Sequence, residues 1–137
     1  MANAPFPTSA TELLRAQEAT QRWAWDACRW WGERNVDVLV TPTVVEPPCL
    51  LSEMDGQLVD PETLGMRVAS QCAFTEPFNV TGEPAVSLPL HWTDSGLPIG
   101  IQLVAPYGSE SVLLQLAAQL EQAQPWQDRW REMAASL

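Results

Sequence analysis

The sequence contains no lysine and only one histidine, His91, among its 137 residues. Its seven basic side chains are all arginines, against 17 acidic side chains, and the formal net charge is -10. A surface of this charge repels phosphate backbones and anionic lipid headgroups. We therefore expect neither nucleic acid nor a membrane among the partners of this protein.

Cysteine is also scarce, and its spacing excludes two kinds of site. Cys28, Cys49 and Cys72 are an odd number, stand far apart and form no CxxC motif. A disulfide framework or a zinc site needs paired cysteines, so we expect reduced thiols that pack as small hydrophobic side chains. No apolar run is long enough to span a bilayer, and the amino-terminal stretch lacks the basic and apolar regions of a secretion signal. These features predict a cytoplasmic protein.

Motifs that hold metals or nucleotides are missing as well. His91 has no second histidine or carboxylate at metal-binding spacing, such as HExxH. Gly82, Gly96, Gly100 and Gly108 are isolated, with neither a GxGxxG motif nor a following lysine to bind phosphate. We expect no metal site and no cofactor.

Hydrophobic side chains make up 46% of the residues, which suits a compact domain or part of a larger one. Ser9 and Glu12 have the spacing of a capping box, so a helix is expected to begin there and to end near Arg34, before Asn35. Its apolar face is expected to carry Leu13, Ala16, Thr20, Trp23, Ala27, Trp30 and Trp31. Trp25 lies on the polar side of this helix, either as an ordinary exposed aromatic or as a contact for something outside the chain.

The remaining pattern predicts an α/β fold, with a mixed sheet flanked by helices: about three strands, three helices and one hairpin. The expected elements are a strand over Val36–Thr41 stopped by Pro42, a loop over Val44–Asp60, a helix from Pro61 to about Phe74, hairpin strands over Ala85–Leu90 and Pro98–Ala105 joined by a turn at Thr93–Gly96, and a helix from Ser109–Glu110 to Ala123. The tail after Pro125 is expected to form a short helix or a frayed end.

The stretch FTEPFNVTG, Phe74 to Gly82, combines residues that shape the backbone. Gly82 tolerates a left-handed conformation, and Pro77 restricts its neighbours. We expect a stiff, shaped turn that enters a strand. The residues alone favour a simple connection between a helix and a strand over a loop that lines a substrate site.

The carboxyl-terminal half resembles a known enzyme family. The stretch PFNVTGEPAVSLPLHWTDSGLPIGIQLVAPYGSESVLLQLAAQLEQAQPW, Pro77 to Trp126, looks like the carboxyl-terminal end of amidase signature family enzymes. It combines an FN-TG-PA-SLP block, a GLPIG-QLVA block and a helix ending in PW. With DVLVTPT and FTEPF before it, the resemblance covers Val36–Trp126, and we expect it to include the first helix.

Members of that family hydrolyse carboxamides with a serine nucleophile, a second serine on a cis peptide bond and a lysine base, beside a glycine/serine-rich segment that supplies oxyanion-hole N–H groups. This sequence departs from the pattern: it has no lysine, no Ser-Ser pair and no glycine/serine-rich run. No catalytic residue is therefore predicted. Loss of such a triad costs about a million-fold in rate, so the chain is expected to be inactive alone.

The resemblance implies a single partial domain, residues 1–137, that forms the carboxyl-terminal part of an amidase. It also implies that the 74–82 segment lines the substrate channel of a complete enzyme, which makes Phe74, Thr75, Phe78, Asn79 and Gly82 the candidate substrate-binding residues. The expected partners are the signature-bearing part of an amidase or further copies of the chain, with a small amide substrate only in a complete enzyme. Two alternatives stay open: a natural subunit that completes a signature-bearing chain, and a stand-alone interaction module.

Overall fold

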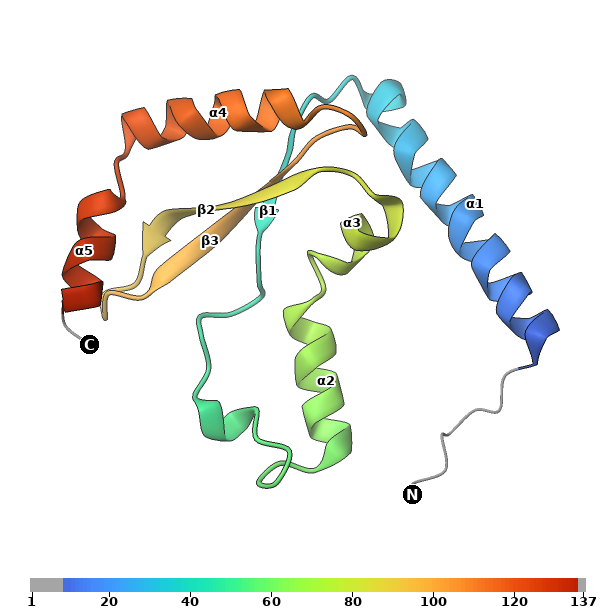
Figure 1. Ribbon diagram of the computed structural model, residues 1–137, viewed down its shortest axis with the longest axis horizontal. Coiled ribbons are helices and arrows are strands. Elements are labelled where there is room, and N and C mark those ends of the chain that lie inside the picture. The colour runs from blue at the N-terminus through green and yellow to red at the C-terminus, as the bar shows by residue number, and fades with distance from the viewer. Residues whose placement is uncertain (1–8, 136–137) are drawn as a thin grey trace.

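The chain is organised around three strands, and the computed structural model describes residues 9–135. Its elements are α1 (Ala10–Arg34), β1 (Leu39–Pro42), a 3-10 turn η1 (Leu51–Glu53), α2 (Pro61–Gln71), α3 (Glu76–Thr81), β2 (Ala85–Trp92), β3 (Pro98–Val104), α4 (Glu110–Ala123) and α5 (Gln127–Ala135). The strands lie in the order β1-β3-β2 and both pairings are antiparallel. Figure 1 shows α4 on one side of this sheet and α2 and α3 on the other. The predicted α/β class and the predicted β2–β3 hairpin are both confirmed.

The register gives the two faces of the sheet different chemistry. Val86 pairs with Leu103, whereas the next residue, Ser87, pairs with Gln102, which in turn pairs with Thr41 of β1. Because successive side chains point to opposite faces, one face is apolar and the other carries a polar row. The ladder is irregular between Leu88 and His91.

The hydrophobic core lies between the apolar face of the sheet and α4. Its buried members are Leu88, Leu103, Ala105 and Leu113. Leu113 is the residue of α4 that is buried, in agreement with the stripe predicted for that helix. At the far end of the hairpin, α5 is attached by an edge-to-face contact between Trp92 and Trp130, with ring centroids 5.6 Å apart. The tail therefore forms a helix, one of the two predicted outcomes.

Helix α1 begins and ends where its sequence predicts. The Ser9 side chain accepts from the backbone N–H of Glu12, the Glu12 carboxylate accepts from the Ser9 N–H, and Asn35 ends the helix in the left-handed conformation. The predicted apolar face is only partly buried, however. Trp31 is buried, but every residue from 9 to 23 is exposed. The amino-terminal half of α1 extends away from the sheet (Figure 1), and its side chains stay exposed.

Two other sequence predictions need correction. The first strand begins at Leu39 and not at Val36, because the chain is still leaving α1 there: the Val36 N–H lies 3.5 Å from the Trp31 carbonyl oxygen. The segment from Glu76 to Thr81 is a short helix and not only a turn. Pro77 fits in its first turn, where an N–H has no helical partner anyway.

The three cysteines are unpaired, as expected, but all are half-buried and not fully buried. Among residues 9–135, no helix combines the length and the hydrophobicity that crossing a membrane requires. The same residues include no group of three or more His, Cys, Asp or Glu side chains placed to hold a metal ion.

Candidate functional site

The 74–82 segment connects α2 to β2, and local contacts build it into a rigid unit. The Thr75 hydroxyl donates to the Cys72 carbonyl oxygen at 3.3 Å, and the Asn79 N–H donates to the Thr75 carbonyl oxygen at 3.2 Å. The Gly82 N–H closes the helix by donating to the Phe78 carbonyl oxygen at 2.9 Å. Gly82 has a φ of 76°, a left-handed conformation that glycine adopts without the steric cost of a side chain.

Gln102 anchors the beginning of this segment to the polar face of the sheet. Its side-chain Nε2 donates to the Phe74 carbonyl oxygen at 2.7 Å and lies 3.1 Å from the Thr41 hydroxyl. Only 4% of Gln102 is exposed, so these bonds are made away from bulk water. A buried amide without partners is costly, and this pair of bonds therefore fixes Phe74 relative to β1 and β3.

The polar row continues beside Gln102 with two hydroxyl groups. Ser87 Oγ and Thr43 Oγ1 lie 2.6 Å apart. Both pack over Gly100, where an added Cβ would come within 2.6 Å of the serine oxygen and 2.8 Å of the threonine oxygen. A glycine at this position thus allows the β1–β3–β2 face to carry closely spaced hydroxyls.

Glu83 anchors the other end of the segment to α1. The indole Nε1 of Trp31 and the hydroxyl of Thr81 both donate to its carboxylate, the latter at 2.7 Å. Glu83 is 7% exposed, and these two donors satisfy a buried acceptor that has no basic partner in the described ion pairs. Burial, together with the nearby Glu83 charge, raises the pKa of the Cys28 thiol, which favours its neutral form.

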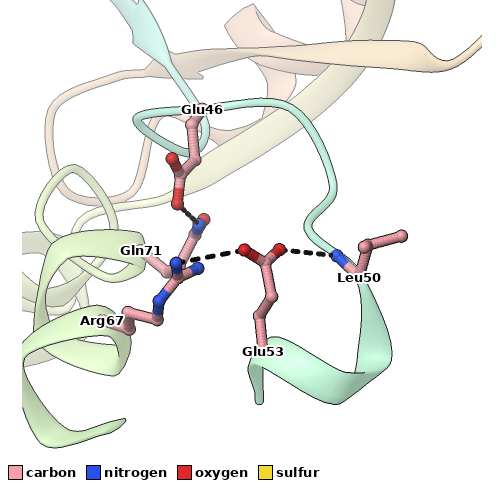
Figure 2. Close-up of polar contacts among 5 residues, drawn as sticks. All are labelled: Glu46, Leu50, Glu53, Arg67 and Gln71. Carbon is pink, nitrogen blue, oxygen red and sulfur yellow. Dashed lines mark hydrogen bonds and ion pairs between the residues drawn. The ribbon is translucent and has the colours of Figure 1, made fainter. Parts of the chain in front are cut away.

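The loop between β1 and α2 is held by a separate polar network (Figure 2). Arg67 of α2 contacts the Glu53 carboxylate at 3.2 Å, and the Leu50 N–H donates to the same carboxylate at 2.9 Å. The Gln71 amide donates to Glu46 at 2.9 Å. These contacts attach residues 46–53 to α2. Gln71, the last residue of α2, lies three residues before the 74–82 segment begins.

The predicted substrate-binding residues face different surroundings. Asn79 lines a groove between α2 and α3, together with Leu64, Val68 and Cys72. Phe78 points toward a second hollow at the carboxyl-terminal end of α1. Gly82 lies near Tyr107, whose ring would be 3.8 Å from an added Cβ. The structure thus places the five residues on one short segment, but not around a single pocket.

The described residues cannot form a serine–lysine pair, because the sequence contains no lysine; the hydroxyl of Thr81 has the Glu83 carboxylate beside it instead. Ser87 on the polar face is hydrogen-bonded to the Thr43 hydroxyl, which cannot accept its proton as a base would. His91 is exposed at the irregular part of β2. The arrangement can shape and line a binding surface.

Sequence reasoning missed the two residues that hold the segment in place. Gln102 stands in the apolar strand sequence IGIQLVA, and a polar residue inside such a run is a signal of a buried hydrogen bond. Glu83 stands between Gly82 and Pro84 and carries no comparable signal, because its partner Trp31 is 52 residues away.

Comparison with known proteins points to one family of enzymes. The Amidase family model matches residues 3–114. The 6-aminohexanoate-cyclic-dimer hydrolases of Pseudomonas sp. (strain NK87) and Paenarthrobacter ureafaciens are each 42% identical to this chain over an alignment of 136 positions, gaps included, that covers 87% of this chain and 27% of theirs. A solved structure of 6-aminohexanoate cyclic dimer hydrolase superposes with a TM-score of 0.75 at 38% identity, covering 87% of this chain and 26% of that one.

The fold is therefore that of one part of an amidase-type hydrolase. The chain belongs to the amidase family, as its sequence blocks indicated. It spans about a quarter of the length of the curated relatives it matches.

Proposed function

We propose that this chain is the carboxyl-terminal part of an amidase-signature amide hydrolase, a single partial domain over residues 1–137 that is inactive alone. One observation carries the proposal. The chain is 42% identical to hydrolases of which it spans 27%, yet it contains neither a lysine nor a Ser-Ser pair. The family chemistry thus requires residues from a signature-bearing part.

In the complete enzyme, the 74–82 segment forms one wall of the substrate channel. Phe74, Thr75, Phe78, Asn79 and Gly82 are its proposed substrate-binding residues. The buried bonds from Gln102 and Glu83 support this role, because they hold both ends of the segment and so preorganise it. The signature-bearing part supplies the nucleophile, the base and the oxyanion hole.

The proposed substrates are small carboxamides, whose C–N bond is hydrolysed without a metal or cofactor. The names of these relatives suggest the cyclic dimer of 6-aminohexanoate as the first amide to test. A cytoplasmic location is part of the proposal and is supported by the three unpaired thiols.

The test is complementation of an enzyme that lacks the matching part. The Paenarthrobacter hydrolase is truncated before the segment that this chain matches, and the two polypeptides are co-expressed. We expect release of amine from the cyclic dimer by the pair, and none by either polypeptide alone. Hydrolysis by the purified chain alone, or none by a pair that co-purifies, would contradict the proposal.

A stand-alone interaction module is the second candidate function. Trp25 is 70% exposed and lies on a chain with a net charge of -10, so an aromatic contact within an acidic surface is available to a partner. A monomer that melts cooperatively and binds no hydrophobic dye would favour this candidate over the first.

A further inference from the structure

The chain exposes far more surface than a compact protein of its size. Its accessible area is 10310 Å² at a mass of 15.2 kDa, whereas a compact monomer of that mass exposes about 7,100 Å². The excess is about 3,200 Å². Even if the ten residues outside the described part were fully exposed, they would account for only about 1,600 Å² of it.

The remaining excess, at least about 1,600 Å², exceeds the roughly 800 Å² that each partner buries in a standard protein–protein interface. Exposed apolar side chains on α1, on α2 and on the segment between them contribute to this surface, among them Trp23, Val68 and Val80. We name this surface the α1–α3–α2 face. It comprises two grooves, one on each side of α3, and Glu76 lines both.

The first groove runs between α1 and α3. It is lined by Ala19, Thr20 and Trp23 of α1, and by Ala73, Pro77 and Val80. Trp23 and Val80 are 47% and 42% exposed, although both belong to apolar faces. Thr20 and Trp23 belong to the stripe of α1 that the helical periodicity marks for burial, yet both are exposed, unlike Trp31 farther along the same stripe.

The second groove runs between α2 and α3. Leu64 and Val68 line it from α2, and Asn79 lines it from α3. Figure 1 shows α3 between the two longer helices, which diverge from it. An occupant that fills the space between α1 and α2 would therefore cover both grooves at once.

The match to the solved hydrolase indicates what that occupant is. The match leaves only 13% of this chain uncovered, about 18 residues, which is fewer than the 25 residues of α1. At least part of α1 therefore belongs to the shared fold, and in that hydrolase the shared fold is 26% of a longer chain. A partner that supplies the other three quarters of such a hydrolase is large enough to cover the exposed face of α1.

We infer that the α1–α3–α2 face is the surface onto which the signature-bearing part of an amidase docks. This inference rests on the proposed function for the identity of the partner. It adds the location of the interface and its central contacts, Trp23 and Val80. The 74–82 segment then lies inside the interface, since Asn79 and Pro77 line its two grooves.

Hydrogen exchange tests the location of the interface without any assay of activity. The probe is a fused chain in which this sequence replaces the matching quarter of the Paenarthrobacter hydrolase. We expect peptides from residues 10–23 to exchange at least tenfold more slowly in the fused chain than in the isolated chain. Equal exchange in the two would overturn the inference, because α1 would then be uncovered in both.

Two matched tryptophans on α1 provide the mutational test. Trp23→Glu and Val80→Glu place a charge in the first groove, whereas Trp25→Glu places the same charge on the polar side of α1. In co-purification with the truncated Paenarthrobacter hydrolase, we expect at least tenfold less of the Trp23→Glu and Val80→Glu variants than of wild type, and an unchanged yield of Trp25→Glu. Equal recovery of all three variants would overturn the inference.

The outcomes separate this inference from the proposed function. Protection of α1 in a fused chain that hydrolyses no amide would retain the docking face and reject the function. If the Trp23→Glu and Val80→Glu variants complement the truncated hydrolase as well as wild type does, the proposed function stands and the docking face is rejected. If the isolated chain forms a discrete dimer in which α1 exchanges as slowly as in the fused chain, the occupant is a second copy, and the inference is overturned.

Discussion

At the scale of single residues, the chain depends on polar side chains that are buried and satisfied. Gln102 and Glu83 are 4% and 7% exposed, and each bonds to partners from other parts of the chain. No buried side-chain nitrogen or oxygen in the described residues lacks a partner. Because such groups are costly when unpaired, each of them restricts the chain to one arrangement around the 74–82 segment.

Gln102→Leu should release the beginning of this segment. The change removes both hydrogen bonds and leaves the Phe74 carbonyl oxygen without its buried donor. We expect the free energy of unfolding to fall by about 1–3 kcal/mol, and backbone amides of residues 74–82 to exchange faster. Urea unfolding and hydrogen exchange measure the two effects.

The control for this prediction is Gln115→Leu, which alters an exposed glutamine of α4. An exposed substitution of this kind should change stability by no more than about 0.5 kcal/mol. Equal urea midpoints for the two variants would show that the Gln102 bonds contribute nothing measurable.

At the scale of elements, the position of the short helix α3 depends on the residues at its two ends. The six residues of α3 are too few to be stable as an isolated helix. They are held by Thr75 at the amino-terminal end and by Gly82 at the carboxyl-terminal end. In α1 a full capping box closes the amino-terminal end, yet every residue from 9 to 23 is exposed, so capping alone does not bury this half of the helix.

Gly82→Ala should destabilise the chain through its backbone. The added Cβ meets only ordinary contact with Tyr107, so the cost comes from forcing alanine into the left-handed conformation. That cost is roughly 1–2 kcal/mol and should lower the urea midpoint.

Gly32→Ala is the matched control, because this helical glycine of α1 has open space around an added Cβ. Alanine there should leave stability unchanged or raise it by up to about 1 kcal/mol. A loss as large as that of Gly82→Ala would refute the backbone explanation.

At the scale of the whole molecule, the chain corresponds to one part of a larger fold. Its apolar sheet face is covered by α4, but the α1–α3–α2 face is uncovered. The exposed large apolar side chains include Leu13, Leu14, Trp23 and Met66. Large apolar side chains that stay exposed around a groove are typical of an interface.

The isolated chain should therefore bind 8-anilinonaphthalene sulfonate or increase in size with concentration in light scattering. The reason is that removing exposed apolar surface from water is favourable, and either a dye molecule or another copy of the chain removes it. In the fused chain the dye signal per molecule should fall. A monomer of constant size that binds no dye would contradict the prediction and would point to the interaction module.

The sequence was most informative where the signal was local. The Ser9 capping box, the end of α1 at Asn35, the hairpin around Thr93–Gly96 and the end of α4 before Pro125 all follow from neighbouring residues. Prediction failed at Val36, where a β-branched residue lies just past the end of α1 and its N–H bonds back to the helix instead of joining the strand. It was incomplete at Glu76–Thr81, where proline and glycine suggested a turn and a helix formed between them.

The sequence by itself determined the family, the class of fold and the absence of lysine and of a Ser-Ser pair, because motifs and composition are properties of the chain in one dimension. Only the tertiary structure decided that Gln102 and Glu83 hold the two ends of the 74–82 segment and that half of α1 is uncovered. Periodicity shows that a helix has an apolar face but not whether anything packs against it, since that depends on contacts between residues far apart in the chain.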